Sequence, residues 1–169
     1  DMLEEGTAAH TGEEIAALIE DTGGALALDS SGGTLKVLTP DADLGLGLLF
    51  DSLIRPTFPA EALERKREQL LSDIADAETQ PQNRARMLFN KQVYGDHPLG
   101  RTAAGKKEVV EKLTAADLKA FHAAAFAPDH TTLVVVGDFD TAELLKKVEK
   151  LTADWKPAGD KKPTPPAPP

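Results

Sequence analysis

The stretch PAEALERKREQLLSDIADAET at residues 59–79 carries the longest uninterrupted helical pattern in the chain. Its apolar residues recur at helical spacing and form one stripe: Leu63, Leu70, Leu71, Ile74 and Ala77. Pro59 suits a first helical turn, and Pro81 pushes the residue before it out of the helical region of backbone space. The stretch is therefore expected to be one helix, with Asp73 and Asp76 three residues apart on the same face.

Glycine and proline residues divide the rest of the chain into shorter elements. Residues 1–6 are expected to end a helix, and the other expected helices cover residues 11–22, 39–55, 81–94, 114–126 and 141–151. The expected strands cover residues 24–31 and 34–38, joined at Gly32-Gly33 as a hairpin, and residues 130–136 (HTTLVVV). Because helices outnumber strands and do not alternate regularly with them, the pattern favours an α+β two-layer sandwich over a doubly wound parallel sheet.

The composition is that of an ordinary globular protein, with 41% hydrophobic and 28% charged residues. The net charge of −9 argues against nucleic acid as a partner, because phosphate binding requires clustered Lys and Arg. No apolar run reaches the length of about 18 residues that a transmembrane segment needs. The absence of Cys excludes thiolate chemistry, disulfides and cysteine zinc sites.

Few residues have the spacing of a catalytic or metal site. Asp73 and Asp76 place two carboxylates on one helix face, but a solvated charged face explains them without a metal ion, since cation sites recruit more oxygen ligands. The four histidines form neither an i, i+4 pair nor a zinc motif: His10, His97, His122 and His130. The chain also lacks the G-x-S-x-G sequence of a serine nucleophile elbow.

Five segments, in this order along the chain, resemble one family closely. They are DMLEEGT at residues 1–7, a capped helix ending in GG, RPTFPAEALERKREQLLSDI at 55–74, YGDHPLGR at 94–101 and LVVVGDFD at 133–140. The family is the pitrilysin/insulinase superfamily of metallopeptidases, which includes the mitochondrial processing peptidases and their bacterial relatives. The resemblance implies a half-subunit domain over residues 1–155, with a mostly antiparallel sheet and helices packed on one face. The proline-rich residues 156–169 lie where the family has an interdomain linker.

The resemblance also points to positions of a zinc site. Active members carry an inverted motif, H-x-x-E-H, whose two His bind Zn²⁺ and whose Glu is the base for the metal-bound water. The resemblance places Asp1 in the slot of the second His and Asp73 in the slot of a third ligand, a Glu on the long helix. Asp is one methylene shorter than Glu and does not reproduce a neutral imidazole. The two positions therefore indicate a degenerate site, and no bound zinc or other cofactor is expected.

Active relatives also carry an Asn-Ala-x-Thr-like strand, which pairs with the substrate as an added strand. The corresponding positions here are Ala27, Leu28, Asp29 and Ser30. Ala27 replaces the Asn that would bind the substrate main chain. Backbone pairing with a peptide is therefore expected to remain, while the side-chain contact is lost.

The resemblance and the degenerate zinc positions lead to one main hypothesis of function. The chain is expected to belong to a non-catalytic, bacterial-type subunit, inactive by itself. It would pair with a zinc-bearing peptidase subunit, or with the second domain of the same protein, and help to bind peptide substrate. A second hypothesis is an active zinc metalloendopeptidase whose H-x-x-E-H motif lies upstream of Asp1, and a third is a non-enzymatic assembly subunit.

Two further expectations follow from the resemblance. Family domains begin with a strand before the motif helix, and this sequence begins after it. The sheet is therefore expected to have an open edge, or an edge completed by another molecule or an unassigned segment. A bacterial-type subunit favours the periplasm or cell envelope as its location.

Overall fold

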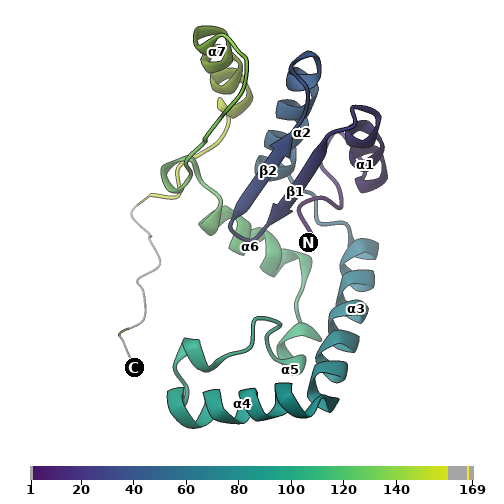
Figure 1. Cartoon of the computed structure of the whole chain (residues 1–169), viewed down its shortest axis with the longest axis vertical. Coiled ribbons are helices and arrows are strands. Elements are labelled where there is room, and N and C mark those ends of the chain that lie inside the picture. Colours follow the sequence, from purple (N-terminus) through teal and green to yellow (C-terminus); the bar gives the residue numbers. More distant parts are fainter. Residues whose placement is uncertain (1, 160–166, 168–169) are drawn as a thin grey trace. The chain divides into compact units, whose positions relative to one another are not determined.

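A computed structural model of the chain describes residues 2–159 and residue 167 (Figure 1). The chain divides into two compact units. One is built from the chain up to Ala62 together with the part that starts at Ala115, and the other is built on Leu63–Thr114. The predicted linker at residues 156–169 lies mostly outside the described residues, so it remains a prediction. No helix among the described residues is long and apolar enough to cross a membrane.

The first unit contains an antiparallel hairpin of β1 (Ala25–Asp29) and β2 (Gly32–Lys36). It is the whole sheet of the described residues, so neither outer edge has a strand neighbour among them. An antiparallel sheet packed against helices makes the unit an α+β structure, as the sequence predicts.

The hairpin turn differs from the prediction. Ser30 and Ser31 form a two-residue turn, whereas Gly32 and Gly33 belong to β2, so the predicted turn at the two glycines is wrong. The Asp29 side chain explains the position of the turn. Its Oδ1 accepts hydrogen bonds from the backbone N–H and the hydroxyl of Ser31, at 2.7 and 2.5 Å, and such a local bond favours a turn.

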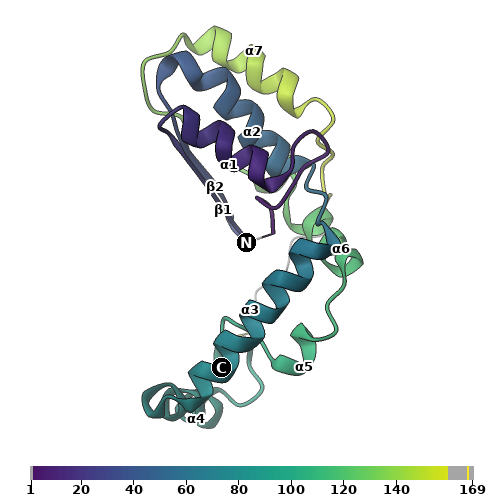
Figure 2. The same cartoon turned by 90° about the vertical axis from the view of Figure 1, so that its right-hand side faces the viewer.

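Two helices cover one face of the hairpin, as Figures 1 and 2 show: α1 (Gly12–Asp21) and α2 (Ala42–Ile54). A capping box begins α1. The Thr11 hydroxyl accepts the N–H of Glu14, and the Glu14 carboxylate accepts the N–H of Thr11. A short 3₁₀ turn, η1 (Thr39–Asp41), leads into α2.

Apolar side chains of these elements meet in two buried clusters. The smaller cluster joins α1 to α2 and contains Ile15, Ile19 and Leu48. The larger cluster joins β1, α2 and the flanking loops, and contains Leu3, Leu28, Leu49, Leu53 and Phe58. Apolar residues that lie at helical spacing along α2 are buried: Leu46, Leu49, Phe50 and Leu53.

Close packing explains one of the two glycines within α2 and not the other. A Cβ at Gly45 would lie 3.1 Å from side-chain atoms of both Leu35 and Val37, so close packing of α2 on β2 accounts for this glycine. A Cβ at Gly47 would meet nothing within 4 Å. Packing therefore does not explain Gly47.

The C-terminal part of the first unit consists of α6 (Ala115–Ala125), η3 (Pro128–His130) and α7 (Thr141–Thr152). Between η3 and α7, residues 131–136 belong to no strand, so the prediction of a strand there is wrong. The segment shares no ladder of backbone hydrogen bonds with a strand of the described residues, and a strand needs such a partner for its backbone groups. Its apolar side chains are exposed, up to 92% at Val136.

The second unit contains most of α3 (Ala60–Thr79), followed by α4 (Pro81–Tyr94), η2 (Pro98–Gly100) and α5 (Lys107–Val110). The predicted long helix is thus confirmed as α3 and the next predicted helix as α4.

A single arginine ties α3 to the chain around α5. The Arg67 guanidinium donates hydrogen bonds to the carbonyls of Val110 and Leu113, the second at 2.5 Å. These bonds satisfy the carbonyl of Val110, the last residue of α5, and that of Leu113, which follows the helix. A helix of four residues is too short to stabilise itself.

Candidate functional site

Three of the four predicted peptide-binding residues lie on an exposed strand edge. Ala27, Leu28 and Asp29 belong to β1, and the outer edge of β1 has no strand beside it in the described part of the chain. Ser30 lies in the turn, so its placement on the strand edge is wrong. Hydrogen bonds from the hydroxyl and the backbone N–H of Ser31 lower the pKa of the Asp29 carboxyl, which therefore stays ionised at the end of the edge.

One hydrogen bond shows which backbone groups face outward from β1. The N–H of Leu28 donates to Oε1 of Glu4 at 2.6 Å and therefore points away from β2. Because strand backbone groups repeat every second residue, the N–H of Leu26 faces the same outer edge. Sequence reasoning missed Glu4, because an isolated Glu in a loop has no pattern that links it to a strand.

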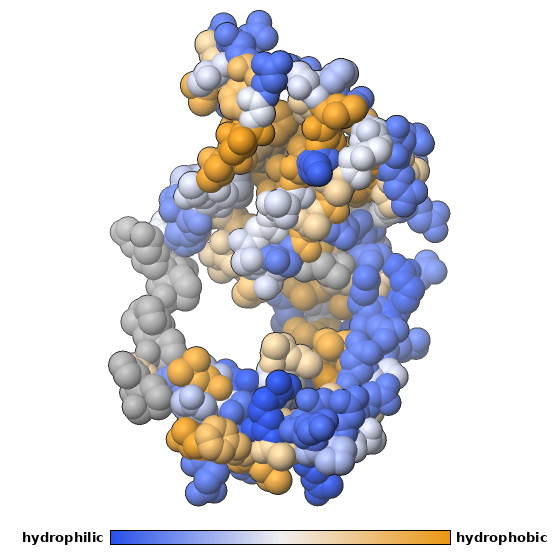
Figure 3. Space-filling view, viewed as in Figure 1, coloured by the Kyte–Doolittle hydropathy of each residue, from blue (hydrophilic) through white to orange (hydrophobic). Residues whose placement is uncertain are grey.

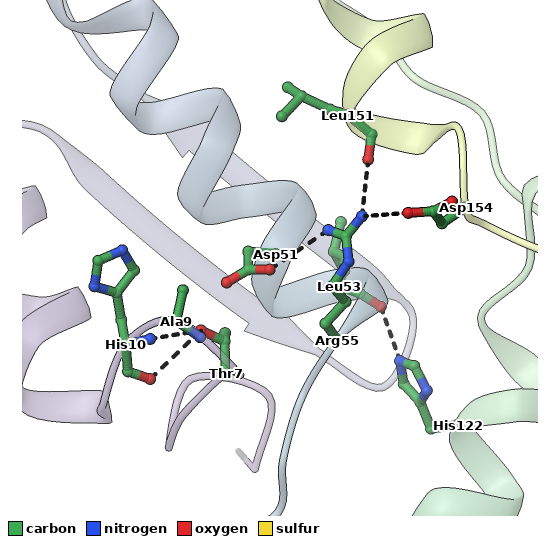
Figure 4. Close-up of polar contacts among 9 residues, drawn as sticks. All are labelled: Thr7, Ala9, His10, Asp51, Leu53, Arg55, His122, Leu151 and Asp154. Carbon is green, nitrogen blue, oxygen red and sulfur yellow. Dashed lines mark hydrogen bonds and ion pairs between the residues drawn. The ribbon is translucent and has the colours of Figure 1, made fainter.

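The loop that carries Glu4 is held by its own hydrogen bonds. The Thr7 hydroxyl accepts the N–H groups of Ala9 and His10 (Figure 4). The carbonyl of Gly6 accepts the N–H of Thr57 at 3.0 Å. Residues 2–6 form turns and a β-bridge, so the predicted helix end is wrong here, since these backbone groups bond across the loop instead.

The C-terminal end of α2 is fixed by two side chains, which Figure 4 shows. Arg55 lies between the carboxylates of Asp51 and Asp154, 3.4 and 4.0 Å away. Nε2 of His122 lies 2.8 Å from the carbonyl oxygen of Leu53, so the ring donates its Nε2 proton to this helix-end carbonyl.

A cavity of about 510 Å³ lies in the first unit, between the hairpin and residues 131–133. Leu49 and Phe50 of α2 and Val148 of α7 supply apolar wall, and Ser30 and Thr131 supply hydroxyl groups. The surface in this region includes many apolar residues (Figure 3). Asp29 and His130 also line the cavity, so its lining is mixed apolar and polar.

The described residues do not fit a zinc ion. Asp73 is exposed on α3, and its Oδ1 accepts the side-chain N–H of Gln69 at 2.8 Å. Asp1, the other degenerate ligand position, lies outside the described residues. Within the part of the chain that the structure describes, no three His, Asp or Glu side chains come together as a metal site needs. These residues therefore offer no ligand set that would hold zinc for catalysis.

Comparison with known proteins identifies the fold. The structure aligns with a TM-score of 0.85 to the crystal structure of a peptidase M16 inactive domain from Pseudomonas fluorescens. The two sequences are 27% identical, and the match covers 99% of this chain and 42% of that one. The fold is thus that of a metallopeptidase-family α+β domain.

Family models and relatives agree with this class. The model of insulinase (peptidase family M16) matches residues 1–107, and the model of the peptidase M16 inactive domain matches residues 112–169. The chain belongs to the insulinase family, peptidase family M16.

Two curated relatives show how much of a family member the chain represents. An uncharacterized zinc protease of Mycobacterium leprae is 28% identical over 153 residues, which are 88% of this chain and 34% of that protein. A Helicobacter pylori protein described as a non-peptidase homolog is 28% identical over 151 residues, 87% of this chain and 35% of that protein. The chain therefore spans about a third of the length of these relatives.

Proposed function

We propose that the chain is part of a non-catalytic subunit of the family, which binds an extended peptide and acts beside a zinc-bearing peptidase subunit or domain. The observation that carries the proposal is the outer edge of β1. The N–H groups of Leu26 and Leu28 face an edge without a strand neighbour in the described residues, and such an edge accepts a peptide as an added strand.

Two further observations support the non-catalytic part of the proposal. The exposed Asp73 carboxylate is paired with Gln69, and the described residues bring no group of acidic or histidine side chains around it. The relative in Helicobacter pylori is described as a non-peptidase homolog, and the family model over residues 112–169 is that of an inactive domain.

A calorimetric titration of the chain with Zn²⁺ tests the non-catalytic part. We expect no saturable heat, because a stable zinc site needs about four ligands held in tetrahedral geometry. One equivalent bound with submicromolar affinity, together with chelator-sensitive peptide hydrolysis, would instead support an active zinc endopeptidase. This second candidate is favoured by the description of the Mycobacterium leprae relative as a zinc protease.

Fluorescence anisotropy with synthetic peptides tests strand addition. The probe is a fluorescein-labelled ten-residue peptide of alternating Val and Thr. A matched peptide, N-methylated at every second residue, keeps one free hydrogen-bonding edge, and another, N-methylated at every residue, keeps none. We expect the first two peptides to bind and the third to fail. Equal binding of all three would show that contacts other than strand pairing hold the peptide.

A further inference from the structure

The backbone donor that an added strand needs on β1 is already occupied. The N–H of Leu28 donates to the Glu4 carboxylate at 2.6 Å, and the two residues are 24 positions apart in the chain. The neighbouring outward donor of Leu26 has no such partner in the described residues. The outer edge of β1 is therefore open at Leu26 and closed at Leu28.

We propose that Glu4 is an intramolecular cap on the outer edge of β1, which an extended chain must displace before it pairs along the whole strand. The cap itself rests only on this structure. Its competition with a peptide rests on the proposed function.

The geometry around Glu4 holds the carboxylate at the strand. Leu3, the residue before it, is buried at 4% exposure in the same cluster as Leu28. Gly6, two residues after it, accepts a hydrogen bond from the N–H of Thr57. With both sides anchored, the Glu4 side chain loses little additional freedom when it reaches Leu28, so the bond forms at low entropic cost.

The chemistry of the bond favours the cap over a neutral competitor. A carboxylate accepts a backbone N–H in a charge-assisted bond, which is shorter and stronger than the bond to a peptide carbonyl. Exchange of Glu4 for a peptide carbonyl is therefore unfavourable. Removal of the carboxylate is expected to tighten peptide binding roughly tenfold or more.

Amide hydrogen exchange and peptide binding together test the cap. The variants are Glu4→Ala, Glu4→Gln and the control Glu20→Ala, which removes an equal charge from the exposed surface of α1. In the wild-type chain the Leu28 amide is expected to exchange more slowly than that of Leu26. This difference in exchange rate between the Leu28 and Leu26 amides should vanish in Glu4→Ala. It should be smaller but still present in Glu4→Gln, whose side chain keeps an uncharged acceptor.

The same variants are then titrated with the fluorescein-labelled Val-Thr peptide. Glu4→Ala is expected to bind it roughly tenfold more tightly than the wild-type chain, with Glu20→Ala unchanged. Equal Leu28 exchange in the wild type and Glu4→Ala would overturn the cap. Equal, measurable peptide affinity of the two chains would overturn its competition with an added strand. If Glu4 protects Leu28 while no variant binds the peptide, the cap stands and the proposed peptide binding fails.

Discussion

Glycine-to-alanine substitutions at three positions of the first unit are expected to destabilise it, leave its stability nearly unchanged or stabilise it, according to the atoms that the new Cβ would meet. A Cβ at Gly24 would lie 2.6 Å from the backbone oxygen of Lys36 and 2.8 Å from side-chain atoms of Thr22 and Val37. Ordinary contact begins at 3.4 Å, and a backbone carbonyl in the hairpin ladder does not move freely. Gly24→Ala should therefore destabilise the unit by about 1–3 kcal/mol, the usual cost of overpacking.

The two helical glycines of α2 serve as matched controls. Gly47→Ala meets nothing within 4 Å, so the helix propensity of alanine should stabilise the unit by about 1 kcal/mol. Gly45→Ala gains the same propensity, but its Cβ would lie 3.1 Å from side chains of β2 and the residue after it. These two effects have opposite sign, so the net change for Gly45→Ala should be close to zero.

Urea unfolding followed by tryptophan fluorescence measures these changes in stability. Trp155 is the only Trp in the chain and donates its indole N–H to the carbonyl of Phe126 in the first unit, so its emission reports the unit that contains the three glycines. The reasoning is refuted if Gly24→Ala is as stable as the wild type, or if Gly45→Ala and Gly47→Ala shift the midpoint equally.

Three other substitutions test the remaining contacts. His122→Ala removes the hydrogen bond to the end of α2 and the ring contacts with Phe58 and Phe126. It should lower the free energy of unfolding of the first unit in urea by about 1–3 kcal/mol. An unchanged unfolding midpoint would contradict a stabilising role for the His122 ring. Trp155→Phe removes the indole hydrogen bond and should lower the free energy of unfolding by about 1 kcal/mol, measured by urea unfolding followed by circular dichroism. An unchanged free energy would mean that this hydrogen bond contributes nothing to stability. Hydrogen bonds from Thr11 lower the pKa of Glu14. The ionised Glu14 side chain therefore stabilises the folded unit fully above the ordinary pKa of Glu, and this stabilisation is lost as the pH falls through the lowered pKa. The advantage of the wild type over Glu14→Gln should therefore shrink as the pH falls from about 6 to about 3 in thermal unfolding, whereas a constant difference would exclude this linkage.

Elements specified by neighbouring residues could be predicted from the sequence. The Thr11–Glu14 capping box and the long helix α3 depend on contacts three or four residues apart, which appear directly in the sequence. The predicted position of the hairpin turn is wrong although the turn is also local, because the prediction rested on the glycine pair in place of Asp29, whose side chain bonds to Ser31 two residues on.

Features that depend on distant partners could not be predicted. The β-branched residues at 131–136 have the propensity of a strand, but a strand also needs a hydrogen-bonded neighbour, and no described strand pairs with them. At the candidate site, the resemblance indicated a strand at Ala27 and Leu28, and both residues belong to β1. Glu4 could not be found in this way, because no local pattern connects it to Leu28, 24 residues away.

Residues 131–136, which pair with no strand in the described part of the chain, also affect how the isolated chain will behave at high concentration. Thr131-Thr132-Leu133-Val134-Val135-Val136 combines high β-propensity with no charge and no proline, which is the signature of sequences that stack as cross-β fibrils. Its most exposed apolar side chain belongs to Val136. A Lys at this position would place a charge at every step of such a stack, so Val136→Lys should delay the rise of thioflavin T fluorescence and keep the chain in solution.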